Sequence, residues 1–257
     1  VTTDTRGVAT LALARPDKHN AMSAQMLVEL TEAIGRLGND AAVRVIVLTG
    51  TGPSFCAGGD LDWMRQQIRA DGPTRAREAM KLATMLQAVN TCPKPVIGRV
   101  QGNAFGGGVG LISVCDMAIA AEGTKLGLTE TRLGLIPATI GPYVVARMGE
   151  AKARRIFMSA RVFEAQEAVS LDLLARVVPT GTLDAAIESE IVPYLSVAPG
   201  AVADAKALLR RLGPVIDETV IAETVEALVR RWESEESVEG IVAFFEKRKA
   251  NWVLGEK

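Results

Sequence analysis

The sequence predicts an α/β protein in which parallel strands are followed by a helical C-terminal part. A short apolar strand, a glycine-rich turn and a helical stretch follow one another twice, over residues 43–65 and 95–115. From about Ile140 onward the strand signal fades and helical periodicity dominates. Alternating strands and helices are typical of parallel sheets, because joining two parallel strands needs a crossover connection.

The N-terminal half contains clear signals for the ends of helices and strands. Val8–Leu13 is expected to be a strand, and Ser23 is placed to cap a helix that continues to about Leu37. The β-branched run Val43–Thr49 predicts a buried strand. Asp60 follows paired glycines and is placed to cap the next helix.

The middle of the chain is expected to contain a loose segment at 70–74, a helix at 75–89, and strands at 95–100 and 117–121. Further helices are expected over 140–148, 151–159, 164–171, 183–196, 201–212, 216–231 and 238–249. A last β pair is expected between 161–163 and 175–178. Pro199-Gly200 introduces the helical end, which divides the chain into a core of residues 1–197 and a helical region of residues 198–257.

Composition excludes several classes of function. The chain has 257 residues, of which 48% are hydrophobic and 23% are charged, and its net charge is −1. These values fit a globular protein with a large core and give no strong attraction to nucleic acid or to a membrane surface. The longest apolar run, 104–115, is too short to span a bilayer, and no signal segment opens the sequence. We expect a cytoplasmic protein.

The cysteines and the single histidine do not indicate a disulfide, metal or nucleophilic site. Cys56, Cys92 and Cys115 lie far apart and lack CxxC spacing, which suits a reducing compartment and predicts neither a disulfide framework nor a zinc site. No histidine lies close to Cys56 in the sequence, so we expect its thiol to be inert. The single histidine, His19, lies in a turn, and no nucleophile–histidine triad can be assembled.

The two glycine-rich junctions are candidates for an oxyanion site. Gly59 and Gly107 each follow a strand and precede a helix, so each can direct a backbone N–H into a cleft. Two such amides would bind a carbonyl oxygen more strongly as it becomes an enolate oxygen. The alternative is that these glycines only permit tight turns. A dinucleotide-binding loop is disfavoured, because Gly106-x-Gly108-x-Gly110 lacks the GxGxxG spacing.

Glu130 is the candidate acid. It is flanked by apolar residues that include Leu128 and Leu133, so partial desolvation would raise its pKa into the range that acid–base catalysis uses. The alternative is a structural role, either at the start of a helix or as the partner of Arg132.

Several motifs in order resemble the crotonase (enoyl-CoA hydratase/isomerase) superfamily over essentially the whole chain. They are residues 15–22 (RPDKHNAM), 55–61 (FCAGGDL), 100–108 (VQGNAFGGG), 115–116 (CD), 129–137 (TETRLGLIP) and 243–249 (AFFEKRK). The resemblance implies a spiral of ββα units with a C-terminal helical trimerisation region, often doubled to a hexamer.

The resemblance also implies an acyl-CoA substrate whose thioester oxygen lies between the amides of Gly59 and Gly107, with Glu130 as the acid–base group. It implies no metal and no cofactor other than the CoA of the substrate. Residues near CoA would be Lys18, His19, Ala57, Asp60 and Leu61, and, reaching the CoA of a neighbouring subunit in relatives, Phe244 and Lys247.

One departure from the pattern leaves the reaction open. Two-acid hydratases carry a first glutamate where this chain has Gly110. Segments 60–64 and 136–145 resemble hydratases of the methylglutaconyl-CoA type, which favours hydration of a short or branched 2-enoyl-CoA in fatty acid or branched-chain amino acid metabolism. The single Glu130 also suits a Δ3-Δ2 enoyl-CoA isomerase. The third possibility is a non-catalytic CoA-binding or scaffold protein.

Overall fold

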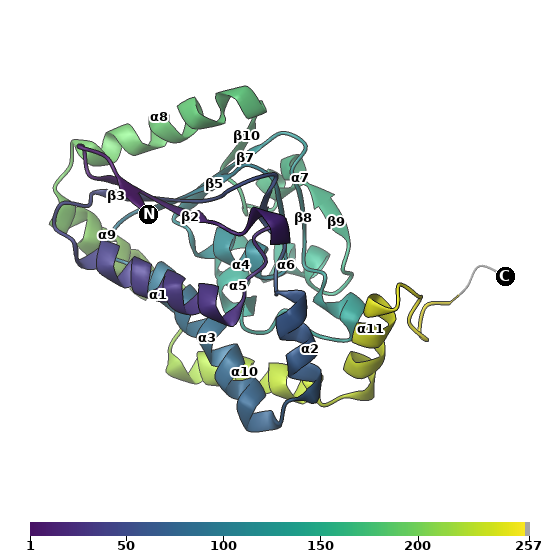
Figure 1. Ribbon diagram of the computed structural model, residues 1–257. Coiled ribbons are helices and arrows are strands. Elements are labelled where there is room, and N and C mark those ends of the chain that lie inside the picture. The colour runs from purple at the N-terminus through teal and green to yellow at the C-terminus, as the bar shows by residue number, and fades with distance from the viewer. Residues whose placement is uncertain (255–257) are drawn as a thin grey trace.

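The computed structural model describes residues 1–254, which form two β-sheets enclosed by helices (Figure 1). The larger sheet has the order β1-β2-β3-β5-β7-β10 and is parallel except for the β1–β2 pair. Its strands are β1 (Thr2–Thr3), β2 (Val8–Leu13), β3 (Val45–Gly50), β5 (Val96–Val100), β7 (Met117–Ala121) and β10 (Arg176–Val178).

The smaller sheet has the order β4-β6-β8-β9, and its first three strands are parallel. These strands are β4 (Ser54–Cys56), β6 (Asn103–Phe105), β8 (Lys125–Gly127) and the antiparallel β9 (Val162–Glu164).

The chain repeats one path three times. It runs through a strand of the larger sheet, then through a strand of the smaller sheet, and then into a helix: β3-β4-α2, β5-β6-α4 and β7-β8-η2. This is the predicted spiral of ββα units. Because β4, β6 and β8 are parallel neighbours, their carboxyl ends lie side by side, and the three segments that follow them begin at one edge of the sheet.

The helices cover both faces of the larger sheet. The α-helices of the described chain are α1 (Ala24–Asn39), α2 (Leu61–Arg69), α3 (Gly72–Thr91), α4 (Gly107–Val114), α5 (Gly141–Met148), α6 (Glu150–Phe157), α7 (Ala165–Ser170), α8 (Leu183–Leu195), α9 (Pro199–Leu212), α10 (Glu218–Trp232) and α11 (Glu235–Phe245). Short 3-10 helices lie at η1 (Pro16–Lys18), η2 (Glu130–Leu133) and η3 (Thr180–Thr182). Leu183, Ile187 and Ile191 of α8 pack on Val47 and Ile119 of the sheet.

The opposite face of the larger sheet packs on α1, α3 and α4, and their buried side chains form the main core. The burial of apolar area here supplies the main stabilising free energy of the fold. None of the helices within the described residues combines the length and the hydropathy needed to cross a bilayer.

Most of the predicted elements are present, with two corrections. Residues 161–163 and 175–178 do contribute strands, but these strands do not pair: β9 joins β8, and β10 joins β7 of the other sheet. The helix α7 lies between them and carries the chain from one sheet to the other. The segment expected to be loose already contains the start of α3, because Asp71 caps the helix by accepting a hydrogen bond from the N–H of Thr74.

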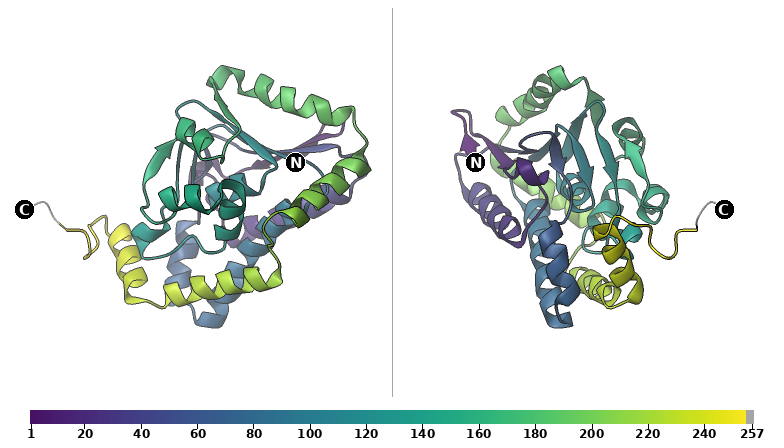
Figure 2. Two further views of the ribbon diagram at one scale, coloured as in Figure 1. Left: turned by 180° about the vertical axis from the view of Figure 1, so that it is seen from behind. Right: turned by 45° about the vertical axis from the view of Figure 1, so that its right-hand side comes forward.

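The helical C-terminal region folds back against the body of its own chain (Figures 1 and 2). α10 packs along α3, and α11 packs on η2. Val225, Leu228 and Trp232 of α10 share a core cluster with Met64 and Ala83 of α2 and α3. The division of the chain at residue 198 stays a prediction; α9 begins at Pro199, and residues 255–257 of the predicted region lie outside the described residues.

Candidate functional site

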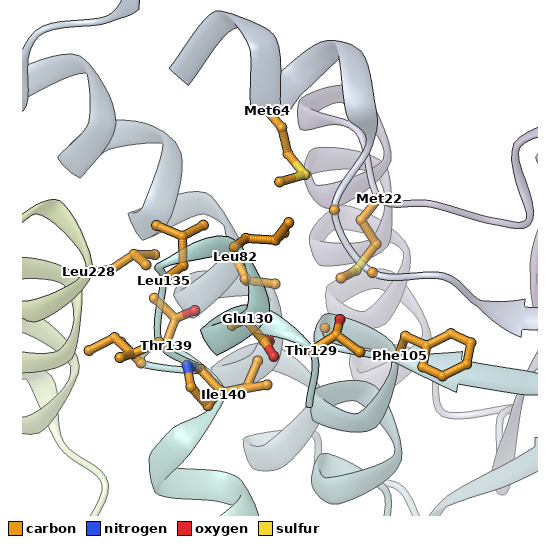
Figure 3. A pocket seen from close by; sticks show the side chains of 18 of the residues that line it. Met22, Met64, Leu82, Phe105, Thr129, Glu130, Leu135, Thr139, Ile140 and Leu228 are labelled. Atoms are coloured by element: carbon orange, nitrogen blue, oxygen red, sulfur yellow. The ribbon is translucent and has the colours of Figure 1, made fainter. Parts of the chain in front are cut away.

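The three candidate catalytic residues lie at equivalent places in the three ββα turns. Gly59 precedes α2, Gly107 begins α4, and Glu130 begins η2. Each lies within a few residues of the carboxyl end of a strand of the smaller sheet. The structure therefore brings Gly59, Gly107 and Glu130 to one edge of that sheet, and all three line one cavity (Figure 3).

The first junction is held in place by the segment that follows η1. The N–H of Met22 donates to the carbonyl of Gly58 over 2.8 Å, and the N–H of Asp60 donates to the carbonyl of Met22 over 3.1 Å. Between these bonds the N–H of Gly59 has no backbone partner among residues 1–254. Gly58 has a φ of +92°, a left-handed conformation that glycine adopts without strain.

Asp60 supports this junction. Its carboxylate accepts hydrogen bonds from the N–H groups of Asp62 and Trp63, over 2.8 and 3.3 Å, and pairs with Arg15 over 2.8 Å. Burial opposes ionisation of Asp60, but the hydrogen bonds from Arg15 and from the two amides outweigh it and lower the pKa. The predicted helix cap is confirmed. Asp60 does not line the cavity, and its predicted contact with substrate stays a prediction.

The second junction lies against the first. The ideal Cβ position of Gly58 is 3.8 Å from the nitrogen of Gly107 and 3.0 Å from the carbonyl oxygen of Phe105. Gly106 has a φ of +50° and donates its N–H to the carbonyl of Gly127. Gly107 is the first residue of α4, and within the described chain its N–H has no backbone acceptor, as expected in the first turn of a helix.

Glu130 directs its carboxyl group at this pair of turns. Its Oε1 lies 3.1 Å from the ideal Cβ position of Gly106, which only a glycine leaves open. Its Oε2 is buried and has no hydrogen-bond partner in residues 1–254. Burial raises the pKa of Glu130 to about 7, although a hydrogen bond from its own backbone N–H opposes the shift. An acid with this pKa can both accept and donate a proton near neutral pH.

The cavity has a volume of about 400 Å³ and mostly apolar walls. Its lining includes Met22, Leu27, Met64, Leu82, Phe105, Leu135, Ile136, Ile140 and, from α10 and α11, Leu228, Trp232 and Phe244. Side chains in the described lining that carry a polar group are those of Trp63, Thr129, Glu130, Arg132, Thr139 and Trp232. The site thus combines two amides without a backbone acceptor and one carboxyl group in one apolar cavity.

The residues predicted to contact CoA fall into two groups. Ala57, Leu61 and Phe244 line the cavity, and Leu61 and Phe244 are 46% and 47% exposed, which places them near its mouth. Phe244 lines the cavity of its own chain, and the contact with the CoA of a neighbouring subunit that the family resemblance implies stays a prediction.

Lys18, His19 and Lys247 are exposed and do not line the cavity. His19 Nδ1 lies 3.0 Å from Ser54 Oγ, and the carbonyl of His19 accepts a hydrogen bond from the N–H of Ala57, so His19 is tied to β4. The contacts of these three residues with CoA remain predictions.

Sequence reasoning did not assign a role in the site to Met22, Thr139, Ile140, Leu228 or Trp232. All of them line the cavity. Met22 and Ile140 belonged to recognised motifs, but their direction depends on packing between distant segments. The helical pattern of residues 216–231 predicted a helix without indicating where α10 would pack.

The expected inertness of Cys56 agrees with its environment. Its thiol is fully buried, and burial raises its pKa to about 12. Cys92 and Cys115 are likewise free and buried. In residues 1–254, no group of three or more His, Cys, Asp or Glu side chains has an arrangement that could hold a metal ion.

Known proteins are similar to this chain in sequence and in fold. The family profile described as Enoyl-CoA hydratase/isomerase matches residues 3–254. A methylglutaconyl-CoA hydratase of Mus musculus is 30% identical over 95% of this chain and 79% of its own length. A crotonyl-CoA hydratase of Syntrophomonas wolfei is 31% identical over 96% and 94%. The crystal structure of an enoyl-CoA hydratase from Shewanella pealeana superimposes with a TM-score of 0.80 and 40% identity, covering 98% of this chain and 94% of the other.

Proposed function

The chain belongs to the enoyl-CoA hydratase/isomerase family of enzymes, and on that premise we propose that it adds water to a short or branched 2-enoyl-CoA thioester. One observation supports the proposal: Gly59 and Gly107, whose N–H groups have no backbone acceptor in residues 1–254, line the same apolar cavity as Glu130.

The two amides would hold the thioester oxygen. As water attacks Cβ, the π electrons of the C=C bond move toward the carbonyl, and the oxygen gains negative charge as an enolate. Fixed N–H donors in an apolar cavity stabilise that charge without reorganising, and each such donor typically contributes roughly 2.7–4 kcal/mol to the transition state.

Glu130 would move the proton. Its ionised form takes a proton from the water as the oxygen bonds to Cβ, and its protonated form then delivers a proton to Cα. Burial, which raises the pKa of Glu130 to about 7, keeps both forms accessible at neutral pH.

The dimensions of the cavity support a small acyl group. A volume of about 400 Å³ with apolar walls suits a short or branched acyl chain, while the pantetheine arm and nucleotide lie outside. Ala57 and Leu61 would contact the arm near the mouth. Lys18, His19 and Lys247 lie on the outside surface, where the two lysines would attract the negative charges of the CoA phosphates.

A Δ3-Δ2 enoyl-CoA isomerase is the second candidate. It needs one carboxylate that removes a proton from one carbon and returns it to another, with the same enolate held by the same amides. Glu130 is the only carboxylate in the described lining of the cavity, and this observation favours isomerisation as the alternative to hydration.

We also propose that the protein assembles as a homotrimer or as a dimer of trimers. Leu209, Leu212 and Val215 are 70%, 76% and 68% exposed, so the end of α9 presents an apolar surface that association would cover. Light scattering coupled to size-exclusion chromatography should give three or six times the mass of one chain, and a monomer would contradict the proposal.

The enoyl-thioester absorbance tests the reaction. The protein should remove this absorbance from crotonyl-CoA or 3-methylglutaconyl-CoA, because hydration consumes the conjugated double bond. Creation of the absorbance from a 3-enoyl-CoA would instead identify the isomerase. A non-catalytic CoA-binding protein would leave the absorbance of all three substrates unchanged. Glu130→Gln should abolish turnover while retaining CoA binding, and full activity in that variant would refute the assignment.

A further inference from the structure

The cavity has no room for a second carboxylate at position 110. A Cβ on Gly110 would lie 2.5 Å from Cγ2 and 3.0 Å from Cβ of Ile140, and 3.7 Å from Cδ2 of Leu86. Ile140 is 2% exposed and lies in the core cluster, so it cannot turn outward without leaving a void. The wall of the cavity beside Gly110 is therefore formed by the side chain of Ile140.

A water that attacks Cβ needs a second hydrogen-bond partner besides Glu130, because one contact does not fix its orientation. This partner must accept the O–H that the water does not give to Glu130. The indole N–H groups of Trp63 and Trp232 and the guanidinium of Arg132 can only donate, and Trp63 and Arg132 already donate to Glu78 and to the carbonyl of Ala160. The hydroxyl groups of Thr129 and Thr139 remain.

Thr139 is the better placed of these two hydroxyls. It directly precedes Ile140, and it is 4% exposed, whereas Thr129 is half-buried. Its hydroxyl forms no hydrogen bond with the rest of residues 1–254, and its oxygen is not one of the fully enclosed unpaired atoms, so it is open to the cavity. In Figure 3 its oxygen points into the cavity, toward the side on which Glu130 lies. A buried hydroxyl without a protein partner costs free energy unless a water or a ligand satisfies it.

We propose that the hydroxyl of Thr139 holds the attacking water, and so takes over the orienting role that a first glutamate has in two-acid hydratases. The unpaired Oε2 of Glu130 and the unpaired hydroxyl of Thr139 line the same cavity, so one water could satisfy both. This inference rests on the proposed hydration, and it assigns to Thr139 a contact with the nucleophile itself.

Glu130 alone can carry out both proton transfers of the hydration. The water bonds to Cβ through its oxygen and gives one proton to the ionised Glu130, while the π electrons move to the thioester oxygen. Thr139 accepts a hydrogen bond from the remaining O–H of the water and keeps its own proton throughout. Glu130 then gives its proton to Cα, and the enolate returns to the thioester. The net change is addition of one water.

Thr139→Val tests the proposal, since it removes the hydroxyl and keeps the branched shape. Hydration of the 2-enoyl-CoA should fall about 10- to 100-fold in kcat, the range expected when one hydrogen bond to a reacting group is lost. Thr139→Ser should restore most of the rate. Exchange of the α-protons of a saturated acyl-CoA such as butyryl-CoA with deuterated water needs only Glu130 and the two amides, so it should continue in Thr139→Val.

Thr124→Val is the matched control. Thr124 is 2% exposed and its hydroxyl is also unpaired, but it does not line the cavity. This variant should hydrate at the wild-type rate. Thermal unfolding should show that Thr139→Val keeps the fold, because valine has the same branched shape as threonine.

Three outcomes would overturn the role of Thr139. They are an unchanged hydration rate in Thr139→Val, a parallel loss of proton exchange and hydration, and a loss confined to Thr129→Val. Failure of the proposed function is distinguishable, because then the wild-type chain itself would not hydrate any 2-enoyl-CoA, and the role of Thr139 would be refuted with it.

Discussion

The side chain of Ile140 occupies the volume into which a side chain at position 110 would project, with its Cγ2 2.5 Å from the ideal Cβ position of Gly110. The two residues are therefore matched: the absence of a side chain at Gly110 in α4 leaves the space that the side chain of Ile140 fills from the loop before α5. The pair fixes the cavity as a site with one carboxyl group.

This match predicts coupled effects on stability. Gly110→Ala should lower the free energy of unfolding by roughly 1–3 kcal/mol through overpacking against Ile140. Ile140→Ala alone should cost about 2–4 kcal/mol by leaving a cavity. In the double variant the added methyl group has space, so the combined loss should be smaller than the sum. Urea unfolding of the four proteins measures the coupling, and additivity within about 0.5 kcal/mol would contradict it.

The buried acid predicts a pH-dependent gain in stability for Glu130→Gln. Burial raises the pKa of Glu130 in the folded protein to about 7, against an ordinary value of 4.5. Below pH 4.5 the carboxyl group is neutral in both states and imposes no penalty. As the pH rises from 4.5 to 7, the unfolded state releases its proton first, so the folded state loses relative stability.

Above pH 7 the loss in free energy of unfolding that the buried carboxylate causes reaches at most about 3 kcal/mol, because each unit of pKa shift corresponds to 1.36 kcal/mol. Glu130→Gln should therefore be more stable than the wild type at pH 8, and the difference should vanish near pH 4. Denaturant unfolding at the two pH values measures it. A variant that is less stable at pH 8 would show that Glu130 is not desolvated.

The same pKa predicts the pH profile of the reaction. If ionised Glu130 must take the first proton, kcat/KM should rise with pH, with an apparent pKa near 7, and then level off. Initial rates with a 2-enoyl-CoA between pH 5 and 9 give the profile. A flat profile across pH 6–8 would mean that another group performs the proton transfer.

The cap at Asp60 predicts a joint loss of stability and activity. Asp60→Ala removes the cap of α2 and leaves Arg15 without its partner, so the free energy of unfolding should fall by about 1–3 kcal/mol. The kcat should also fall, because Gly59 directly precedes the cap and its N–H would lose its fixed direction. Asp62→Ala is the control: Asp62 pairs only with exposed Arg65, and its loss should change stability by less than about 0.5 kcal/mol.

Local signals predicted much of the fold and the three central residues of the site. Val8–Leu13 was predicted with the bounds of β2, and the caps at Ser23 and Asp60 are present, because the determinants of these features lie within a few residues. Gly59, Gly107 and Glu130 were found because strand, turn and helix signals are also local. The sequence placed each of them at a junction, and the parallel order of β4, β6 and β8 then brings the junctions together.

The rest could not be read locally, because it depends on segments that meet only in the folded chain. Gly110 was recognised as a departure from the family pattern, but its contact with Ile140 joins α4 to a loop thirty positions later. The strands β9 and β10 were recognised and then paired wrongly, because the sheet that accepts a strand is decided by its neighbours in space.

The walls of the cavity come from both ends of the chain, since Met22 lines it together with Leu228, Trp232 and Phe244. The last strand of the two sheets ends at Val178, whereas part of the wall of the cavity is supplied by α10 and α11, which follow later in the chain. A chain cut after Val178 would keep both glycine turns and Glu130 but would lack the side chains of α10 and α11 that line the cavity. The last helices of the described chain are therefore part of the site and not only an appendage to it.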